Sequence, residues 1–148
     1  GEGVAGVDTK EQEEAWRLLS DCFHFGSLRV DGEDGAGLEM SVGEAGFYVE
    51  EVFDSPGQTS LREKDVVVAI QGRILAGLQE DEVERAFGAA FADGALLLIC
   101  RCPEELLGGI RPECVASVAA RKLAYHQKKE EEAYAAKPPN NNSNNNNN

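Results

Sequence analysis

The sequence predicts a mainly β fold with added helices, in which a small, partly open β-barrel or sandwich has one helix laid across a seam. Three observations support this prediction. The chain has 148 residues and ends in a tract made almost entirely of Asn, so about 130 residues remain to build one hydrophobic core. Short apolar runs are separated by glycine-bearing turns, which is typical of strands in a compact domain. The expected element order is β-β-β-β-β-α-β.

The strands are expected within residues 23–102. Residues 38–42 alternate strictly between apolar and polar side chains, which is typical of a half-buried strand. Residues 66–70 form a continuous apolar run, which suits a strand that is covered on both faces. Similar patterns predict the remaining strands at residues 23–30, 47–53, 73–75 and 95–102.

One helix is expected before these strands, and another before the last of them. Residues 8–22 carry a single apolar stripe, and Asp8 or Thr9 can cap the first turn. Trp16 lies beside this stripe and can anchor the helix either to a partner or to the chain's own domain. Residues 80–91 carry a second apolar stripe behind an acidic first turn, which suits the positive end of the helix dipole.

The chain after residue 102 has a different character. Pro103 begins a short turn, and Pro112 can occupy the first turn of a further helix whose weak apolar face fades before Lys128. We therefore expect an N-terminal helical extension, a central domain, a C-terminal helical extension and a disordered Asn-rich tail. These segments cover residues 1–22, 23–102, 103–137 and 138–148.

The charge of the chain excludes two classes of partner. Fourteen basic residues against 27 acidic residues give a net charge of −13. Nucleic-acid binding needs a positive surface, and an anionic membrane repels an acidic chain. We therefore expect no nucleic-acid partner and no strong membrane binding. A basic or neutral partner is easier to accommodate.

The cysteines and the other reactive residues do not indicate an enzyme. Cys22, Cys100, Cys102 and Cys114 show no C-x-x-C spacing, although Cys100 and Cys102 share one face of the last expected strand. Free, partly buried thiols are favoured over a metal site or a disulfide, which indicates a reducing, cytoplasmic location. No G-x-S-x-G motif is present. We expect no catalytic residue, no metal and no cofactor.

Several short motifs follow one another within the central domain. They are Gly35-Ala36-Gly37-Leu38, Gly46-Phe47-Tyr48-Val49, Ser55-Pro56-Gly57, Leu61-Arg62-Glu63-Lys64-Asp65, Val66-Val67-Val68-Ala69-Ile70-Gln71-Gly72, Leu78 with the helix from Glu80, and Leu96-Leu97-Leu98-Ile99. Each motif is weak by itself, but together, in this order, they resemble a PDZ domain. In that family the first motif corresponds to a Gly-Leu-Gly-Phe loop that binds a carboxylate.

The resemblance implies an adaptor or scaffold module that binds the C-terminal tail, or an internal extended segment, of a partner protein. The bound segment would add a strand to the edge of residues 38–42, beside the helix of residues 80–91. A glycine-bearing loop lets successive backbone N–H groups converge on an oxyanion. The donors would be the N–H groups of Ala36, Gly37 and Leu38, in the loop that begins at Gly35.

The groove implied by the resemblance combines apolar and acidic side chains. Its residues are Met40, Val42, Glu80, Glu84 and Phe87. A pocket for the ligand's last side chain would be lined by Leu38, Met40 and Phe87. The same three residues also suit an ordinary core. Glu80 and Glu84 favour a basic or hydroxyl-bearing ligand side chain. Alternatively, these two carboxylates only solvate the helix.

The chain departs from the family pattern near the carboxylate loop. Family members often carry a basic residue there, whereas this loop begins Asp31-Gly32-Glu33-Asp34, so only Arg29 can support a bound carboxylate. Lys64-Asp65 stands where Gly-Asp is usual, and Gln71-Gly72 stands where Asn-Gly is usual. Acidic side chains near the loop oppose a ligand carboxylate. These departures affect the expected strength of carboxylate binding more than the fold.

Two other functions are kept as alternatives. In the first alternative, the chain is a regulatory PDZ-like domain of a larger protease, whose catalytic groups would lie outside these residues. In the second, it is a structural scaffold whose groove is occupied by its own flanking helix. The helix that carries Trp16 and the helix that begins at Pro112 are both close enough in sequence to do this.

Overall fold

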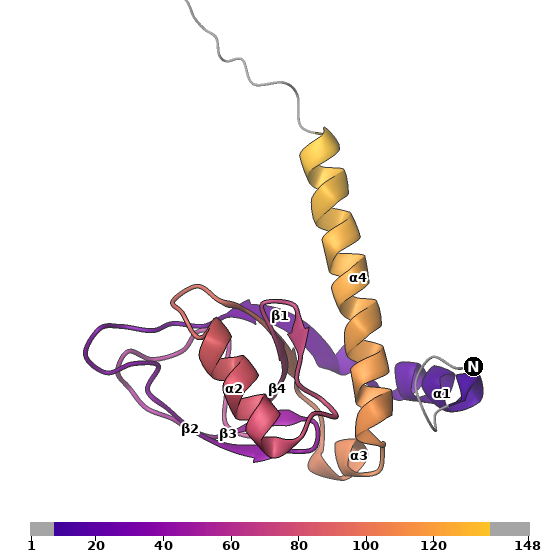
Figure 1. Cartoon of the computed structure of the whole chain (residues 1–148), viewed down its shortest axis with the longest axis horizontal. Helices are drawn as coiled ribbons and strands as arrows, with labels where there is room; N and C mark the ends of the chain where they lie inside the picture. Colours follow the sequence, from indigo (N-terminus) through magenta and orange to yellow (C-terminus); the bar gives the residue numbers. More distant parts are fainter. Residues whose placement is uncertain (1–7, 137–148) are drawn as a thin grey trace, which may run out of the picture.

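The computed structural model describes residues 8–136, so the Asn-rich tail expected at residues 138–148 lies outside the described part. Within residues 8–136, six strands form one antiparallel sheet (Figure 1). The strands are β1 (Phe23–Ser27), β2 (Leu38–Gly43), β3 (Gly46–Val52), β4 (Val66–Ile70), β5 (Arg73–Ile74) and β6 (Leu96–Cys100). Their order is β1-β6-β4-β3-β2, and β5 pairs with β4 beside this path. The sheet stays open between β1 and β2, which confirms the predicted fold class.

The strand patterns follow the burial that the sequence predicts. Every residue of β4 is buried, as expected for a central strand covered on both faces. β2 alternates between partly buried and exposed side chains up to Val42, as expected for an outer strand with one face on the core.

The first strand is shorter than predicted, because β1 ends at Ser27 instead of continuing to residue 30. Beyond it, the Arg29 N–H group donates to the side chain of Gln58, and the Val30 N–H group donates to the side chain of Asp93. Side chains therefore replace the neighbouring strand as hydrogen-bond partners.

In the described part of the chain, four α-helices pack around the sheet: α1 (Thr9–Leu19), α2 (Glu80–Ala90), α3 (Glu104–Gly108) and α4 (Pro112–Ala136). A 3-10 turn over Ser20–Cys22 links α1 to β1. Asp8 caps α1 by accepting a hydrogen bond from the Glu11 N–H group at 2.8 Å. None of the helices in residues 8–136 is long and apolar enough to cross a membrane.

The sheet has a hydrophobic cluster on each side. One cluster lies under α2 and includes Val67, Leu97, Val83 and Phe87. The other lies under the flanking helices, where Leu19 of α1 and Val118 of α4 pack with residues of β4 and β6. Figure 1 shows α2 on one side of the molecule and α1, α3 and α4 together on the other. The flanking helices therefore complete a core that the strands alone leave open.

Specific contacts hold α1 and α4 together. The Arg111 guanidinium donates two hydrogen bonds to the Glu11 carboxylate, at 2.7 and 2.8 Å. The Arg121 guanidinium lies 3.8 Å from the centre of the Trp16 ring, which is a cation–π contact. Trp16 therefore anchors α1 to the chain's own domain. Further along α4, His126 stacks on Phe25 of β1, with ring centroids 4.2 Å apart.

An ion pair with a buried carboxylate and a partly exposed guanidinium connects the residue after β6 to the segment that precedes β4. The Asp65 side chain is 2% exposed, and its two carboxylate oxygens accept hydrogen bonds from Arg101, both at 2.7 Å. Arg101 also donates to the Ser60 carbonyl, and Asp65 also accepts the Arg62 N–H group. The hydrogen bonds from Arg101 to Asp65 raise the pKa of the guanidinium. This bidentate geometry is the strong form of an ion pair.

We expect Asp65→Ala to lower the free energy of unfolding by about 2–4 kcal/mol, because it leaves the Arg101 guanidinium and the Arg62 N–H group without their partner. Urea denaturation of the full chain measures this loss. The matched control is Glu14→Ala, which removes an exposed carboxylate paired with Arg17 and should change the stability by less than about 0.5 kcal/mol. Equal effects of the two substitutions would contradict a central role for the buried pair.

We expect Leu19→Ala in α1 to cost about 2–5 kcal/mol, because Leu19 is fully buried in the cluster under the flanking helices. Leu98→Ala in β6 removes an equally buried side chain from the same cluster and provides the comparison. Thermal and urea unfolding of the full chain should show similar losses for both variants. A loss below about 1 kcal/mol for Leu19→Ala would show that α1 is not part of the core.

Candidate functional site

The predicted groove residues meet between β2 and α2. Leu38, Met40 and Val42 of β2 are partly buried and pack against the same cluster as Phe87 of α2. Phe87 is 6% exposed, and its ring meets the ring of Phe47 edge to face with centroids 4.8 Å apart. The apolar residues predicted for the ligand pocket therefore lie together at one face of the sheet, and they also belong to its core.

The glycine loop enters β2 through two left-handed residues. Gly35 has φ +64° and Gly37 has φ +63°, a region that favours glycine. Asp31 and Gly35 exchange both backbone hydrogen bonds, at 2.9 and 3.1 Å, which closes the loop between them. A side chain at Gly37 would place its Cβ 2.4 Å from the Ser55 carbonyl oxygen. The loop therefore requires glycine at position 37 for two separate reasons.

The loop presents backbone donors at the start of β2. No acceptor within residues 8–136 takes the N–H group of Ala36 or Gly37. Phe53 donates its N–H to the Gly37 carbonyl at 2.8 Å, next to the paired residues Leu38 and Val52. In an antiparallel ladder this makes Leu38 and Val52 a non-hydrogen-bonded pair, so the Leu38 N–H points away from β3. Three consecutive N–H groups are thus available to an acceptor outside the described chain.

Gln58 holds this loop in place. Its side-chain amide nitrogen donates to the Arg29 carbonyl at 2.8 Å and to the Ala36 carbonyl at 2.7 Å. Its side-chain oxygen accepts the Arg29 N–H at 3.0 Å. One side chain therefore connects the chain entering the loop with the chain leaving it. Sequence reasoning did not identify Gln58, because no local pattern distinguishes it from a surface glutamine.

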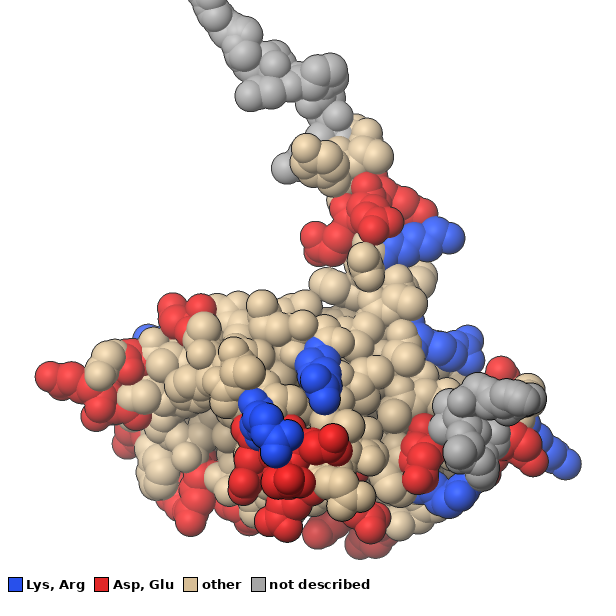
Figure 2. Space-filling model, viewed as in Figure 1, with Lys and Arg blue, Asp and Glu red and all other residues tan. Residues whose placement is uncertain are grey.

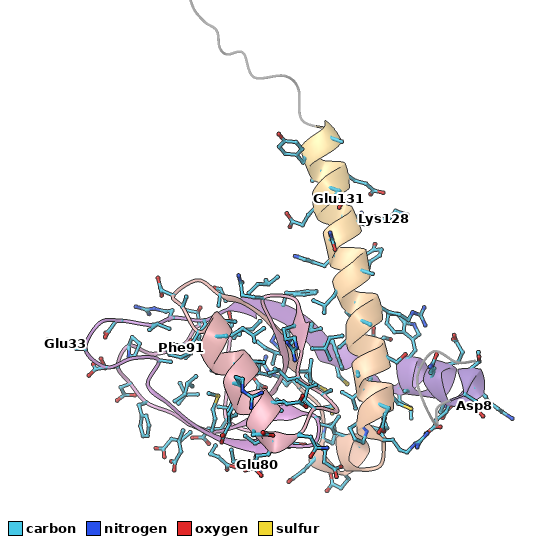
Figure 3. All side chains as sticks on the ribbon, viewed as in Figure 1. Asp8, Glu33, Glu80, Phe91, Lys128 and Glu131 are labelled. Carbon is cyan, nitrogen blue, oxygen red and sulfur yellow. The ribbon has the colours of Figure 1, made fainter. Side chains whose placement is uncertain are left out.

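The acidic residues of the loop stabilise its own turn. The Asp31 carboxylate accepts the N–H groups of Glu33 and Asp34, at 2.8 and 2.7 Å. Asp34 accepts the hydroxyl of Ser55. Figure 3 shows Glu33 at the outer tip of the loop. The acidic sequence thus has a structural role here, because two of its carboxylates satisfy donors of the loop and of the neighbouring segment.

Arg29, the predicted support for a carboxylate, is held at the loop through its backbone. Both of its main-chain polar groups are bound to Gln58, while its side chain is exposed. No contact within residues 8–136 fixes its guanidinium beside Ala36 or Gly37. The support of a carboxylate by Arg29 therefore stays a prediction.

Exposed aromatic residues lie beside the glycine loop and at the end of α2. Phe53 is 45% exposed and is tied by its N–H group to Gly37. Phe91 is 39% exposed and lies next to Phe87, with ring centroids 5.9 Å apart. Figure 3 shows Phe91 at the end of α2 nearer to the loop and Glu80 at the opposite end. Sequence reasoning placed Phe91 in the helix stripe and did not assign either aromatic residue to the site.

The other end of the groove is acidic. Glu80 and Glu84 are both exposed on α2, and the first turn of the helix also contains Asp81 and Glu82. Figure 2 shows acidic side chains gathered over the start of α2, with basic side chains bordering them. A positive charge on a ligand is favoured at this end.

The structure offers no arrangement for metal chemistry in the described part of the chain, since no three His, Cys, Asp or Glu side chains within residues 8–136 are placed to hold a metal ion. Cys100 and Cys102 do share one face, with their sulfur atoms 3.7 Å apart. Burial raises the pKa of the Cys100 thiol, and the neighbouring Cys102 adds to this effect. These thiols lie in the cluster under the flanking helices, away from the groove cluster.

The comparisons with solved structures return PDZ domains. A cysteine-to-serine mutant of the fifth PDZ domain of InaD is 20% identical, with a TM-score of 0.47, and the match covers 55% of this chain and 90% of that one. The same domain in dithiothreitol is 20% identical with a TM-score of 0.43, covering 55% and 92%. No protein-family model and no curated protein matches the chain. These likenesses concern the fold and identify no ligand.

We expect Gly37→Ala to disrupt the loop, because it combines a positive φ with a contact against the Ser55 carbonyl. The free energy of unfolding should fall by about 1–3 kcal/mol, and hydrogen exchange at residues 31–37 should accelerate. The matched control is Gly32→Ala, since a Cβ at Gly32 meets nothing within 4 Å. A loop that tolerates both substitutions equally would contradict the close fit described here.

Proposed function

We propose that this chain is a protein interaction module that binds the C-terminal tail of a partner protein. The tail enters the groove between β2 and α2 and adds a strand to the outer edge of β2. Its carboxylate accepts hydrogen bonds from the N–H groups of Ala36, Gly37 and Leu38. The function is one of binding and requires no catalytic group.

The observation that carries this proposal is the set of unused donors in a loop that several other hydrogen bonds hold in place. The loop is held by hydrogen bonds with the side chains of Gln58, Asp31 and Ser55. The N–H groups of Ala36 and Gly37 have no acceptor within residues 8–136. A preorganised donor set loses little entropy when it binds an anion. Each charge-assisted hydrogen bond contributes on the order of 1.5–3 kcal/mol.

The surroundings of the loop also favour a peptide. β2 is an outer strand, and its free edge supplies main-chain groups for strand addition. The partly buried Met40 and the exposed aromatic ring of Phe91 offer apolar surface for the last side chain of the ligand. The buried residues of α1 and α4 belong to the other cluster. The alternative of a groove filled by its own flanking helix is therefore less favoured.

The test is a fluorescence-polarisation screen of C-terminal peptides against the full chain, with every hit repeated as its C-terminal amide. We expect hits with dissociation constants near micromolar, about −8 kcal/mol. Amidation should weaken them about 100-fold, because it removes the charge that the three N–H groups bind. The full chain is required, because the flanking helices supply part of the core.

The matched variants for this test are Gly37→Ala and Gly32→Ala. Only Gly37→Ala should abolish binding of the free-acid peptides. Peptides that bind equally well with and without the amide would indicate recognition of an internal segment and contradict the role of the loop. A complete absence of hits would contradict tail binding and return the self-occupied scaffold as the better description.

A further inference from the structure

A separate cavity of about 360 Å³ lies at the far end of the groove. Four parts of the chain form it: the end of β2 with the turn that follows, the segment that leads into α2, the first residue of α2 and the first residue of α4. The lining residues are Val42, Gly43, Glu44, Gly77, Leu78, Gln79, Glu80 and Pro112. Only Val42 and Glu80 of this set belong to the groove that the sequence predicts.

A hydrogen bond joins two walls of this cavity. The Gly77 N–H group donates to the Glu44 carbonyl at 2.9 Å and thereby joins the β2–β3 turn to the segment before α2. Gly77 has φ +86°, and a Cβ at this position would approach the Pro112 carbonyl at 3.9 Å. Gln79 and Glu82 form a capping box that holds the start of α2. The C-terminal extension therefore contributes one wall of a preformed hollow.

The register of an added strand determines which ligand residue reaches the cavity. A carboxylate at the start of β2 requires a ligand strand antiparallel to β2, so that the ligand's earlier residues lie toward Gly43. Directly opposed residues on paired strands project their side chains to the same face, and the faces alternate along a strand. With the last residue opposite Leu38, the residue two positions earlier lies opposite Met40, and the residue four positions earlier lies opposite Val42. The side chain of this residue, four positions before the last, therefore faces the cavity.

The charge of the cavity selects a cation. Glu44 and Glu80 line it and have no ion-pair partner within residues 8–136. The basic residue nearest in sequence on α2, Arg85, is paired with Asp81 at 3.3 Å. Attraction between opposite charges is stronger in a partly enclosed site than on an open surface. A lysine or arginine side chain, with an apolar stem and a charged end, matches a hollow that combines Val42 and Leu78 with two carboxylates.

We propose that this cavity is a subsite for a lysine or arginine side chain located four residues before the C-terminal residue of the ligand. This inference rests on the proposed function, and it names the class of tail that the groove prefers. Pro112 belongs to the subsite, so the C-terminal extension contributes directly to specificity.

The experiment uses a C-terminal peptide selected in the amidation screen. Its residue four positions before the end is made lysine, the uncharged isostere norleucine or glutamate, and the dissociation constant is measured for each. We expect lysine to bind about 5- to 20-fold more tightly than norleucine, and glutamate to bind more weakly than both. Lysine moved to three positions before the end faces away from the cavity and should lose this advantage.

Variants of the full chain distinguish a lysine preference that arises in the cavity from a general attraction between a basic peptide and an acidic protein. In the double variant Glu44→Gln/Glu80→Gln, the preference for lysine should fall below about 2-fold. The matched control is Glu39→Gln, an exposed residue on the outward face of β2, which should preserve the preference. Pro112→Arg should reverse the preference between the lysine and glutamate peptides, whereas Pro112→Gln should not.

The outcomes distinguish this inference from the proposed function. If amidation abolishes binding but lysine and norleucine bind equally well, the subsite is wrong and tail binding stands. If the lysine preference persists unchanged in the Glu44→Gln/Glu80→Gln variant, the carboxylates of the cavity do not bind the lysine ammonium group, and the inference is overturned. If binding does not depend on the free carboxylate, the register that places the fourth residue at Val42 fails together with the proposed function.

Discussion

The ion pair between Asp65 and Arg101 holds the segment on which the glycine loop depends. Residues 53–65 contain neither helix nor strand, and their backbone hydrogen bonds lie near the two ends of the segment. Arg101 binds both the Asp65 carboxylate and the Ser60 carbonyl, and the Ser60 hydroxyl accepts the N–H group of Ser27. Gln58 belongs to the same segment as Ser60 and Asp65, and its side chain donates a hydrogen bond to the Ala36 carbonyl. The position of the glycine loop therefore depends on the position of this segment. A guanidinium just beyond β6 therefore helps to set the direction of backbone donors at the start of β2.

The core extends across the boundaries that composition suggests. The acidic central part and the charge-balanced C-terminal part differ in sequence, yet β4 and β6 bury one face against α1 and α4. A chain of residues 23–102 alone would expose that apolar face to water, at a cost of about 25 cal/mol for each Å². The same arrangement places Pro112 at the end of the groove. The same extension thus contributes both to the core and to the lining of this cavity.

Local patterns predicted the elements whose side chains follow a strict period. Strict alternation over residues 38–42 is compatible only with a strand that buries one face, and the apolar run of residues 66–70 only with a strand that buries both faces. Both strands are found where they were predicted. The apolar stripe that contains Phe87 likewise identified the face of α2 that packs on the core. Gln58 was missed because its partners, Arg29 and Ala36, are distant in sequence and are reached only after folding. The contribution of Pro112 was missed for the same reason, since no spacing in the sequence relates it to Glu44 or Glu80.

The last contact of α4 with the body is the stacking of His126 on Phe25. Beyond it, residues 127–136 remain helical and are exposed, and Figure 1 shows this part of the helix rising clear of the sheet. With a rise of 1.5 Å per residue, these turns extend about 15 Å from the body. The helix therefore acts as a stiff spacer, which separates the groove-bearing body from any domain, fluorophore or surface attached at Ala136.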